Sequence, residues 1–445
     1  MEYVKKFRAE NSPAFLLTSL IHYYRIVRKN KWGGVVMRAL TKEVSCGAWL
    51  MMGCKSLIAV VDYIYGAVYV ILMNERGLNA FEISTVFAVS TMLLFLFDFP
   101  TGAISDKYGR KKVAGIGIIV WGLSFFFFLR AYSLLDFLVA QAVLQAGIAL
   151  VSGNFQTWFF DLTEKYEEAS FRDAFLMKVG IVVQIFSIVG SLLGAMILVV
   201  GIDTLYVGCA ISMIATGILC VLIGEDNHSA QGEGKNLITH FLAVTKEFVR
   251  SPVAHRLIPF EFVMGFSTYA FILGWQLYVL NVLHIPKYQI GAILVGFMVA
   301  LLAGRQLGVL PKKRQWTLEA MIVFACVIMA AGFAVLFLIP RFAFFLTGAI
   351  LVELGLGLYY SAQEIWLLTK IPSQNKASFF SGLKTLEEVF IFCLSLCIGA
   401  IAQWIGLRYL WLVALVLMMA GWGYFRLVLY SKPPTVQRQT NGLDI

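Results

Sequence analysis

Charged residues are scarce in this chain. Asp, Glu, Lys and Arg make up 14% of the 445 residues, and hydrophobic residues make up 60%, with a mean hydropathy of +0.80. Soluble domains carry about 25% charged residues. This deficit excludes an ordinary soluble protein and predicts a polytopic membrane protein.

Histidine is missing from the long apolar runs. The chain has five histidines, all in polar stretches: His22, His228, His240, His255 and His284. A histidine proton relay within the membrane is therefore excluded, and carboxylates must carry any such proton.

The sequence also lacks the motifs of several catalytic classes. Its seven cysteines are scattered without zinc spacing or a disulfide framework, and there is neither an HExxH motif nor an ATP-binding P-loop. We therefore expect no metal, no cofactor and no enzymatic activity. The formal net charge of +10 does not indicate nucleic-acid binding, because basic residues beside apolar spans are typical of cytoplasmic loops that face anionic lipid headgroups.

Twelve apolar runs have lengths near the roughly 20 residues that span a bilayer. They cover residues 46–73, 81–103, 112–132, 134–160, 172–200, 203–223, 257–283, 288–310, 316–338, 341–369, 379–404 and 407–430. The polar stretch 224–256 separates them into two sets of six. We therefore expect an all-α protein with an N-terminal six-helix bundle (46–223), a linker (224–256), a C-terminal six-helix bundle (257–430) and a tail (431–445).

Basic residues predict the orientation of these spans. Of the 36 Lys and Arg, one lies inside the first span and five lie in loops on one side: Lys55, then Arg76, Arg130, Lys287, Arg341 and Arg408. The other thirty lie on the opposite side, which is predicted to be cytoplasmic and to hold both termini. Residues 1–45 carry nine of them and are predicted to form a cytoplasmic arm, either a helix in the headgroup plane or a solvated segment.

A dense polar stretch follows the second span. It reads Asp98-Phe-Pro-Thr-Gly102-Ala-Ile-Ser-Asp106-Lys-Tyr-Gly109-Arg110-Lys111-Lys112. Its Gly-x-x-x-Asp-x-x-Gly-Arg-Lys spacing resembles the loop between helices 2 and 3 in the major facilitator superfamily of secondary transporters. The resemblance implies two pseudo-symmetric bundles that rock around a central site, a conformational role for Gly102, Asp106, Gly109, Arg110 and Lys111, and a monomer in the cell membrane.

An internal repeat supports two related halves. Trp158 through Ala169-Ser-Phe171 recurs as Trp366 through Ala377-Ser-Phe379, at an offset of 208. The stretch Gly304-Arg-Gln-Leu-Gly-Val-Leu-Pro-Lys312-Lys313-Arg314, interpreted as the loop after the eighth span, keeps the basic run but lacks the acid.

Helices 1, 4, 7 and 10 line the central cavity in the superfamily, so polar groups deep in those spans are the candidates for a site. Asp62 is the first, because an ionised group in mid-membrane is expensive unless it meets water or a partner. It shares a helical face with Lys55 and Tyr69. A structural hydrogen bond to a neighbouring helix is the alternative role for Asp62, and snorkelling to headgroups is the alternative for Lys55.

Further candidates come from the other three spans. Asn154 and Gln156 in the fourth span can donate and accept hydrogen bonds, and Trp275 and Gln276 lie in the seventh. Glu353 in the tenth span has no cation nearby in the sequence and is the second candidate for proton or cation binding. Glu261 and Glu364 are closer to the cytoplasmic boundary, where a gate network is expected.

These observations predict secondary transport of a small molecule by alternating access. Acids in an aromatic cavity favour proton-coupled efflux of lipophilic or cationic compounds, since a carboxylate can hold either a proton or a cation. Transport of a neutral metabolite or lipid-like solute, and ligand sensing without transport, are the alternatives.

Overall fold

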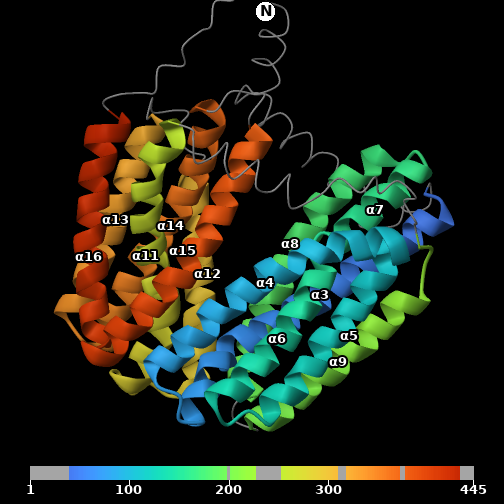
Figure 1. The fold of residues 1–445 in the computed structure, drawn as a ribbon, viewed down its shortest axis with the longest axis horizontal. Coiled ribbons are helices and arrows are strands. Elements are labelled where there is room, and N and C mark those ends of the chain that lie inside the picture. Colours follow the sequence, from blue (N-terminus) through green and yellow to red (C-terminus); the bar gives the residue numbers. More distant parts are fainter. Residues whose placement is uncertain (1–39, 198–200, 227–251, 309–316, 371–375, 431–445) are drawn as a thin grey trace, which may run out of the picture.

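The computed structural model describes residues 40–197, 201–226, 252–308, 317–370 and 376–430, and these residues are almost entirely helical (Figure 1). The first half contains α3 (Lys42–Glu75), α4 (Ala80–Tyr108), α5 (Arg110–Leu129), α6 (Leu134–Val151), α7 (Asn154–Lys165), α8 (Ala169–Ile197) and α9 (Ile202–Leu222). The second half contains α11 (Pro252–Asn281), η1 (Lys287–Gln289), α12 (Ile290–Leu307), α13 (Leu318–Leu338), α14 (Phe342–Lys370), α15 (Lys376–Trp404), α16 (Leu407–Tyr424) and η4 (Phe425–Tyr430).

These helices correspond one for one to the twelve predicted spans, with one interruption. Within the described residues, eleven stretches are long and apolar enough to cross a membrane, and α8 adds a shorter apolar stretch over Lys178–Gly194. The fourth predicted span is broken into α6 and α7. Gly153 stands at the break with a φ of +70°, a conformation that favours glycine, so the helix axis changes direction there.

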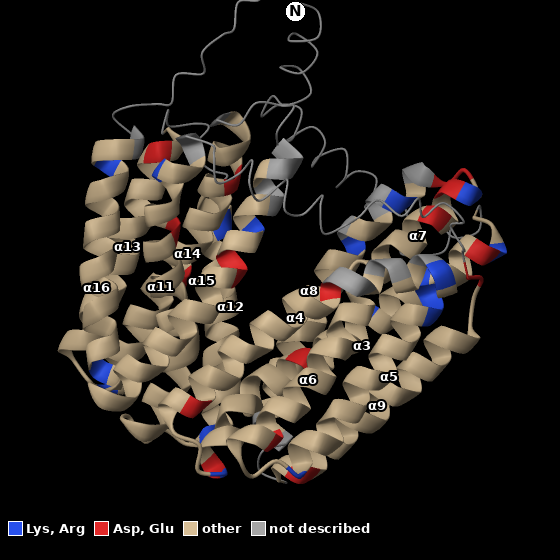
Figure 2. Ribbon diagram, viewed as in Figure 1, with Lys and Arg blue, Asp and Glu red and all other residues tan. Residues whose placement is uncertain are grey.

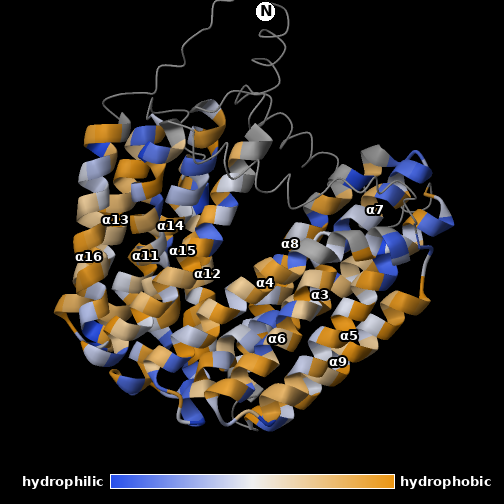
Figure 3. Ribbon diagram, in the orientation of Figure 1, coloured by the Kyte–Doolittle hydropathy of each residue, from blue (hydrophilic) through white to orange (hydrophobic). Residues whose placement is uncertain are grey.

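Polar side chains fix several helix starts at the membrane boundary. Asn79 and Glu82 form a reciprocal capping box at the start of α4, and Ser133 and Asp136 form another at the start of α6. Such boxes satisfy the free N–H groups of the first helical turn. The charges lie mainly near the two ends of the helices, and the middle of each bundle is apolar (Figures 2 and 3).

Each half forms a bundle with its own apolar core. We call α3 to α9 the N-terminal bundle and α11 to α16 the C-terminal bundle. In the first, α5 packs on α6 and α9; in the second, α13 packs on α14 and α16. Corresponding helices begin 205 to 210 residues apart, as with Ile202 and Leu407 or Lys42 and Pro252. The packing therefore repeats with nearly the spacing of the sequence repeat.

The bundles meet through α4 with α15 and through α8 with α12. At one end, which we call the closed end, Asn74 pairs with Asn281, the Lys287 ammonium contacts the Glu75 carboxylate, and the Phe81 ring stacks on Trp404 with centroids 5.6 Å apart. Toward the other end, the open end, the ribbons of the two bundles diverge (Figure 1). The first described turn of α3 lies at the open end.

Candidate functional site

A cavity of about 400 Å³ lies on the side of the N-terminal bundle. Its lining comes from α3, the α6–α7 break and α8: Lys55, Ile58, Ala59, Asp62, Tyr63, Val151, Ser152, Gly153, Phe155, Gln156, Val183, Gln184 and Ser187. The broken helix exposes Ser152 and Gly153 to this cavity, which a straight helix would not do. The site is thus partly a product of the left-handed glycine.

Asp62 is the acid of this cavity. Its side chain is exposed, and it forms no hydrogen bond or ion pair with another described residue. Lys55 lies seven residues earlier on α3 and is half-buried, so the two charges line the same cavity about 10 Å apart along the helix. An acid without a partner in this position can accept a proton or a cation.

The two candidates in the fourth span are divided between the cavity and the protein interior. Gln156 is exposed and lines the cavity with Asp62. Asn154 is buried, and its Nδ2 donates to the Leu150 carbonyl oxygen at 2.9 Å, across the α6–α7 break. The structure therefore places Asn154 as a support for the break.

Three aromatic and amide candidates are buried away from this cavity. The Tyr69 hydroxyl accepts from Gln141 Nε2 at 2.5 Å inside the N-terminal bundle. Gln276 Nε2 donates to the Gly66 carbonyl oxygen at 3.0 Å, which joins α11 to α3, and Trp275 packs edge-on against Phe297. Gln276 is consequently a contact between the bundles, close beside the cavity helix.

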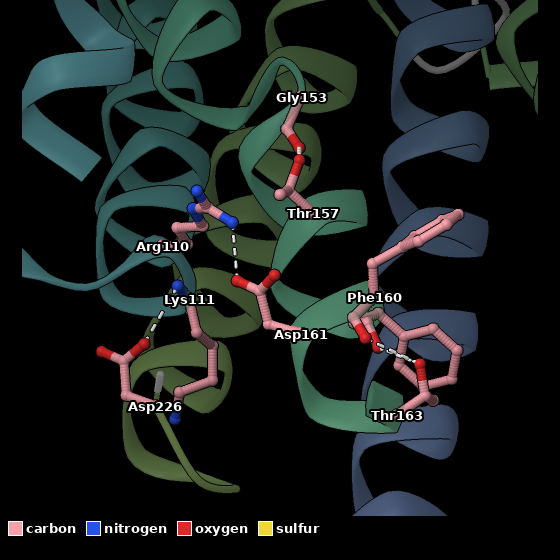
Figure 4. A network of polar contacts seen from close by, with 9 residues as sticks. Arg110, Lys111, Gly153, Thr157, Phe160, Asp161, Thr163 and Asp226 are labelled. Atoms are coloured by element: carbon pink, nitrogen blue, oxygen red, sulfur yellow. Dashed lines mark hydrogen bonds and ion pairs between the residues drawn. The ribbon is translucent and has the colours of Figure 1, made fainter. Parts of the chain in front are cut away.

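The polar loop motif joins four parts of the N-terminal bundle (Figure 4). Gly109 has a φ of +97° between α4 and α5, and a Cβ atom there would lie 2.3 Å from Asp226 Oδ2. The Arg110 guanidinium forms an ion pair with Asp161 of α7 at 2.6 Å. Gly102 and Asp106 lie in α4, and the surroundings of Gly102 and the side chain of Asp106 are outside the described part of the structure.

Lys111 is buried and binds the C-terminal end of α9. Its Nζ donates to the carbonyl oxygens of Ile223 at 2.7 Å, Gly224 at 2.8 Å and Val221 at 3.3 Å, while its backbone N–H donates to Asp226. A cation is favoured at the negative end of a helix dipole. The motif therefore fastens the α4–α5 turn to the point where the chain leaves the bundle.

The chain just after α9 is held from α7 as well. Trp158 Nε1 donates to the Glu225 carbonyl oxygen at 2.9 Å, and the Glu225 carboxylate contacts the Lys165 ammonium and the Tyr166 hydroxyl. Hydrogen bonds from Lys165 and then Tyr166 stabilise the charged form and lower the pKa of Glu225.

Comparison with known proteins agrees with this arrangement. The family model described as Major Facilitator Superfamily matches residues 51–386, about three quarters of the chain. This chain belongs to the major facilitator superfamily. It is thus a multi-pass membrane protein of a secondary-transporter family, as the loop motif indicated.

Solved structures of superfamily members share the fold at low sequence identity. An inward-facing bacterial homologue of the human lysosomal transporter Spinster is 13% identical, with a TM-score of 0.65 over 87% of this chain and 97% of that one. The nucleoside transporter NupG is 11% identical, with a TM-score of 0.71 over 85% and 99%. A search of curated proteins finds no match.

The second acid candidate lies in the opposite bundle. Glu353 is half-buried on α14, and it forms no hydrogen bond or ion pair with another described residue. It does not line the cavity of Asp62. The two carboxylates therefore lie in different halves of the molecule.

The sequence analysis missed the nature of Glu261. It is buried in α11, and its carboxylate accepts from the Tyr359 hydroxyl at 3.3 Å and from Gln363 Nε2, both on α14. Tyr359 and Gln363 lie four residues apart on α14, and this spacing was the available signal. Glu261 lies inside the C-terminal bundle and binds two partners.

Proposed function

We propose that this superfamily member exchanges protons for lipophilic or cationic small molecules by alternating access, and that Asp62 holds the proton or the cargo. Asp62, exposed and unpaired in the cavity among the described residues, is the single observation on which the proposal depends. An intramembrane carboxylate is a functional candidate by default, because its charge is expensive in hydrocarbon.

Closure of the open end would make that charge still more expensive. Water solvates Asp62 while the cavity is open, and closure removes this water. The carboxylate then needs a proton or a bound cation, because an unpaired buried charge is strongly unfavourable. The protein can then close only when Asp62 holds either a proton or a cationic cargo. Transport of the cargo is thereby coupled to transport of protons at this one carboxylate.

The closed end supports alternating access. Asn74–Asn281, Glu75–Lys287 and Phe81–Trp404 are exposed contacts between two separately packed bundles. Exposed polar and ionic contacts contribute little each, about 0–1 kcal/mol, so they can break and re-form. We propose that the open end is cytoplasmic in the cell membrane, with both termini there, and that the protein acts as a monomer.

An apolar groove favours the second candidate, a lipid-like or neutral solute. It has a volume of about 590 Å³ and lies between α3, α8 and α9, lined mainly by apolar side chains such as Met52, Val60 and Phe186. A cargo that partitions into the membrane could reach α3 along this groove. Such a cargo would not need Asp62 in its charged form.

Flux in proteoliposomes tests the proposal, with tetraphenylphosphonium as a lipophilic cation. We expect a pH gradient to drive its transport, and Asp62→Asn to reduce this flux by about tenfold or more, since the amide cannot exchange a proton. Asp203→Asn, which changes an exposed acid at the closed end, is the control. Thermal unfolding of both variants should match that of the parent.

Two results would contradict the proposal. Transport by Asp62→Asn with unchanged pH dependence would make Asp62 a structural anchor and direct attention to Glu353. Saturable binding of the cation with no flux, with or without a gradient, would favour a ligand sensor.

A further inference from the structure

Arg305 lies within the last turn of α12, the helix that packs against α8 of the N-terminal bundle. The sequence analysis placed Arg305 in the eighth span, 288–310, and also interpreted Gly304–Arg314 as the loop after it; in the structure α12 continues through Leu307. The Arg305 side chain is exposed, and its guanidinium lies 6.0 Å from the centre of the Tyr360 ring on α14. It forms no ion pair with another described residue.

Arg305 also acts on the opposite bundle. Its charge also influences the hydroxyl of Tyr63, which lines the cavity of that bundle. Tyr63 is the chain neighbour of Asp62. Because α12 packs against α8 of the N-terminal bundle, an exposed guanidinium that lies near Tyr360 and influences Tyr63 faces the space between the bundles, and not the lipid.

The contact between α8 and α12 fixes the depth of this cation. Ser191 Oγ lies 3.8 Å from Met298 Sδ, where the two helices meet. Ser187 is one turn from Ser191 toward the open end, and Arg305 is two turns from Met298 in the same direction. Arg305 and the Asp62 cavity therefore lie at neighbouring depths on opposite walls.

Arg305 is also held by close packing of its own helix. A Cβ atom at Gly304 would lie 2.1 Å from the Leu354 carbonyl oxygen, and one at Gly357 would lie 2.1 Å from that of Leu301. Two glycines thus let α12 and α14 approach closely. A cation mounted on such a tightly packed helix pair keeps its position better than one on a loop.

We infer that Arg305 is an anion-binding subsite, and that the transported compound carries a cationic group for Asp62 and an anionic group for Arg305. Asp62 on one wall and Arg305 on the other each have no ion-pair partner among the described residues, and closure removes water from both. A zwitterionic compound would neutralise both charges at once, as a guanidinium binds carboxylate, phosphate or sulfonate through paired hydrogen bonds. The inference rests on the proposed transport function and narrows its cargo.

Charged thiol reagents can measure the potential on each wall without a gradient or a known cargo. Single cysteines are introduced by Ser152→Cys, beside Asp62, and by Tyr360→Cys, beside Arg305, after the accessible Cys46, Cys393 and Cys397 are changed to serine. The probes are the sulfonate and trimethylammonium forms of an ethyl methanethiosulfonate. Their rate ratio reports the local charge.

We expect Arg305→Gln to lower the ratio of sulfonate to ammonium rates at position 360 by about tenfold, since one charge lies close by in a poorly screened cavity. Arg305→Lys should keep the ratio. Arg426→Gln is the matched control, because Arg426 is exposed on η4, lies 5.8 Å from the centre of the Trp422 ring on α16, and is far from the N-terminal bundle (Figure 1). An unchanged ratio in Arg305→Gln, or an equal fall in Arg426→Gln, overturns the subsite.

Three six-carbon compounds test the class of cargo. Hexylamine should slow modification at position 152 only, hexanoate at position 360 only, and 6-aminohexanoate at both. Protection of position 152 by 6-aminohexanoate with none at position 360 overturns the zwitterionic assignment. If Arg305→Gln left the rate ratio at position 360 unchanged, the anion-binding subsite would be wrong, but proton coupling at Asp62 would stand. If the rate ratios changed as expected but proteoliposomes showed no flux, only the transport proposal would be contradicted.

Discussion

The two bundles have the same helix order and packing, but their polar contacts at equivalent positions differ. At the repeat offset of 208, Trp158 corresponds to Trp366 and Lys111 to Glu319. In the first half, Lys111 binds the end of α9 and Trp158 binds the chain just beyond it. In the second half, Trp366 Nε1 donates to the Glu319 carboxylate at 3.1 Å. Opposite charges thus occupy one position of the repeat.

The fourth and tenth spans differ in a related way. Gly153 breaks the fourth span and opens its backbone to the cavity, whereas Ser361, 208 residues later, lies inside the continuous helix α14. The break therefore brings the backbone of the first half to the wall of the Asp62 cavity, whereas the described lining of that cavity includes no residue of the second half. The comparison shows that the apolar packing of the helices is the same in both halves, whereas the polar contacts at equivalent positions differ.

The strongest test of this asymmetry is Lys111→Met. The variant leaves three carbonyl oxygens at the end of α9 without their cation, and hydrogen bonds to charged groups contribute about 1.5–3 kcal/mol. We expect the free energy of unfolding in mild detergent to fall by about 2 kcal/mol. Lys112→Met, at the exposed neighbouring position, should change it little; equal losses in both variants would refute the anchoring role of Lys111.

Gly153→Ala is expected to have an intermediate effect. No atom lies within 4 Å of a Cβ built at Gly153, so the cost is that of the left-handed backbone alone, about 1 kcal/mol. Gly208→Ala is the control, since Gly208 is helical and equally uncrowded, and alanine there should be neutral or stabilising. If thermal unfolding ranks the two variants in the opposite order, the break at Gly153 is not maintained by its φ angle.

The smallest effect is expected for Glu319→Gln. The amide oxygen can still accept from Trp366 Nε1, so only the charge is lost, at a cost of about 0.5 kcal/mol near the start of α13. Chemical unfolding of Glu319→Gln and of Lys111→Met, under the same conditions, compares how much the charge at this position contributes to the free energy of unfolding in each half. A loss as large as that of Lys111→Met would mean that both halves depend equally on the charge at this position.

The sequence predicted the fold well because hydrophobic length and basic loops are local signals. All twelve spans were found, and the glycine, arginine and lysine of the loop motif form specific contacts. The break at Gly153 was not predicted, because hydropathy carries no information about a φ angle. The partners of Glu261 were not predicted either, because Tyr359 and Gln363 lie about a hundred residues away in the sequence and contact it only when the helices pack.

Within the site, the depth of a residue was more predictable than its direction. Asp62 and Gln156 face the cavity, whereas Asn154, two residues from Gln156, turns inward to support the break. Arg305 was counted both in the eighth span, 288–310, and in the loop after it, so its place in the last turn of α12 was left open. Direction depends on where each helix starts and bends, and that information is distributed over the whole bundle.

The length of α3 determines how far its open end moves when the helix rotates. With 34 residues α3 is about 51 Å long, against a hydrocarbon core of about 30 Å, so it extends well beyond the bilayer. Its final turn is held at the closed end by the ion pair of Glu75 with Lys287, and its start is tied to Glu168 through the N–H of Thr41. Pivoting about Glu75 by about 15°, a size known for rigid-body rotations, would sweep the start of α3 through about 13 Å. A small rotation of α3 at the closed end would therefore produce a large displacement at the open end.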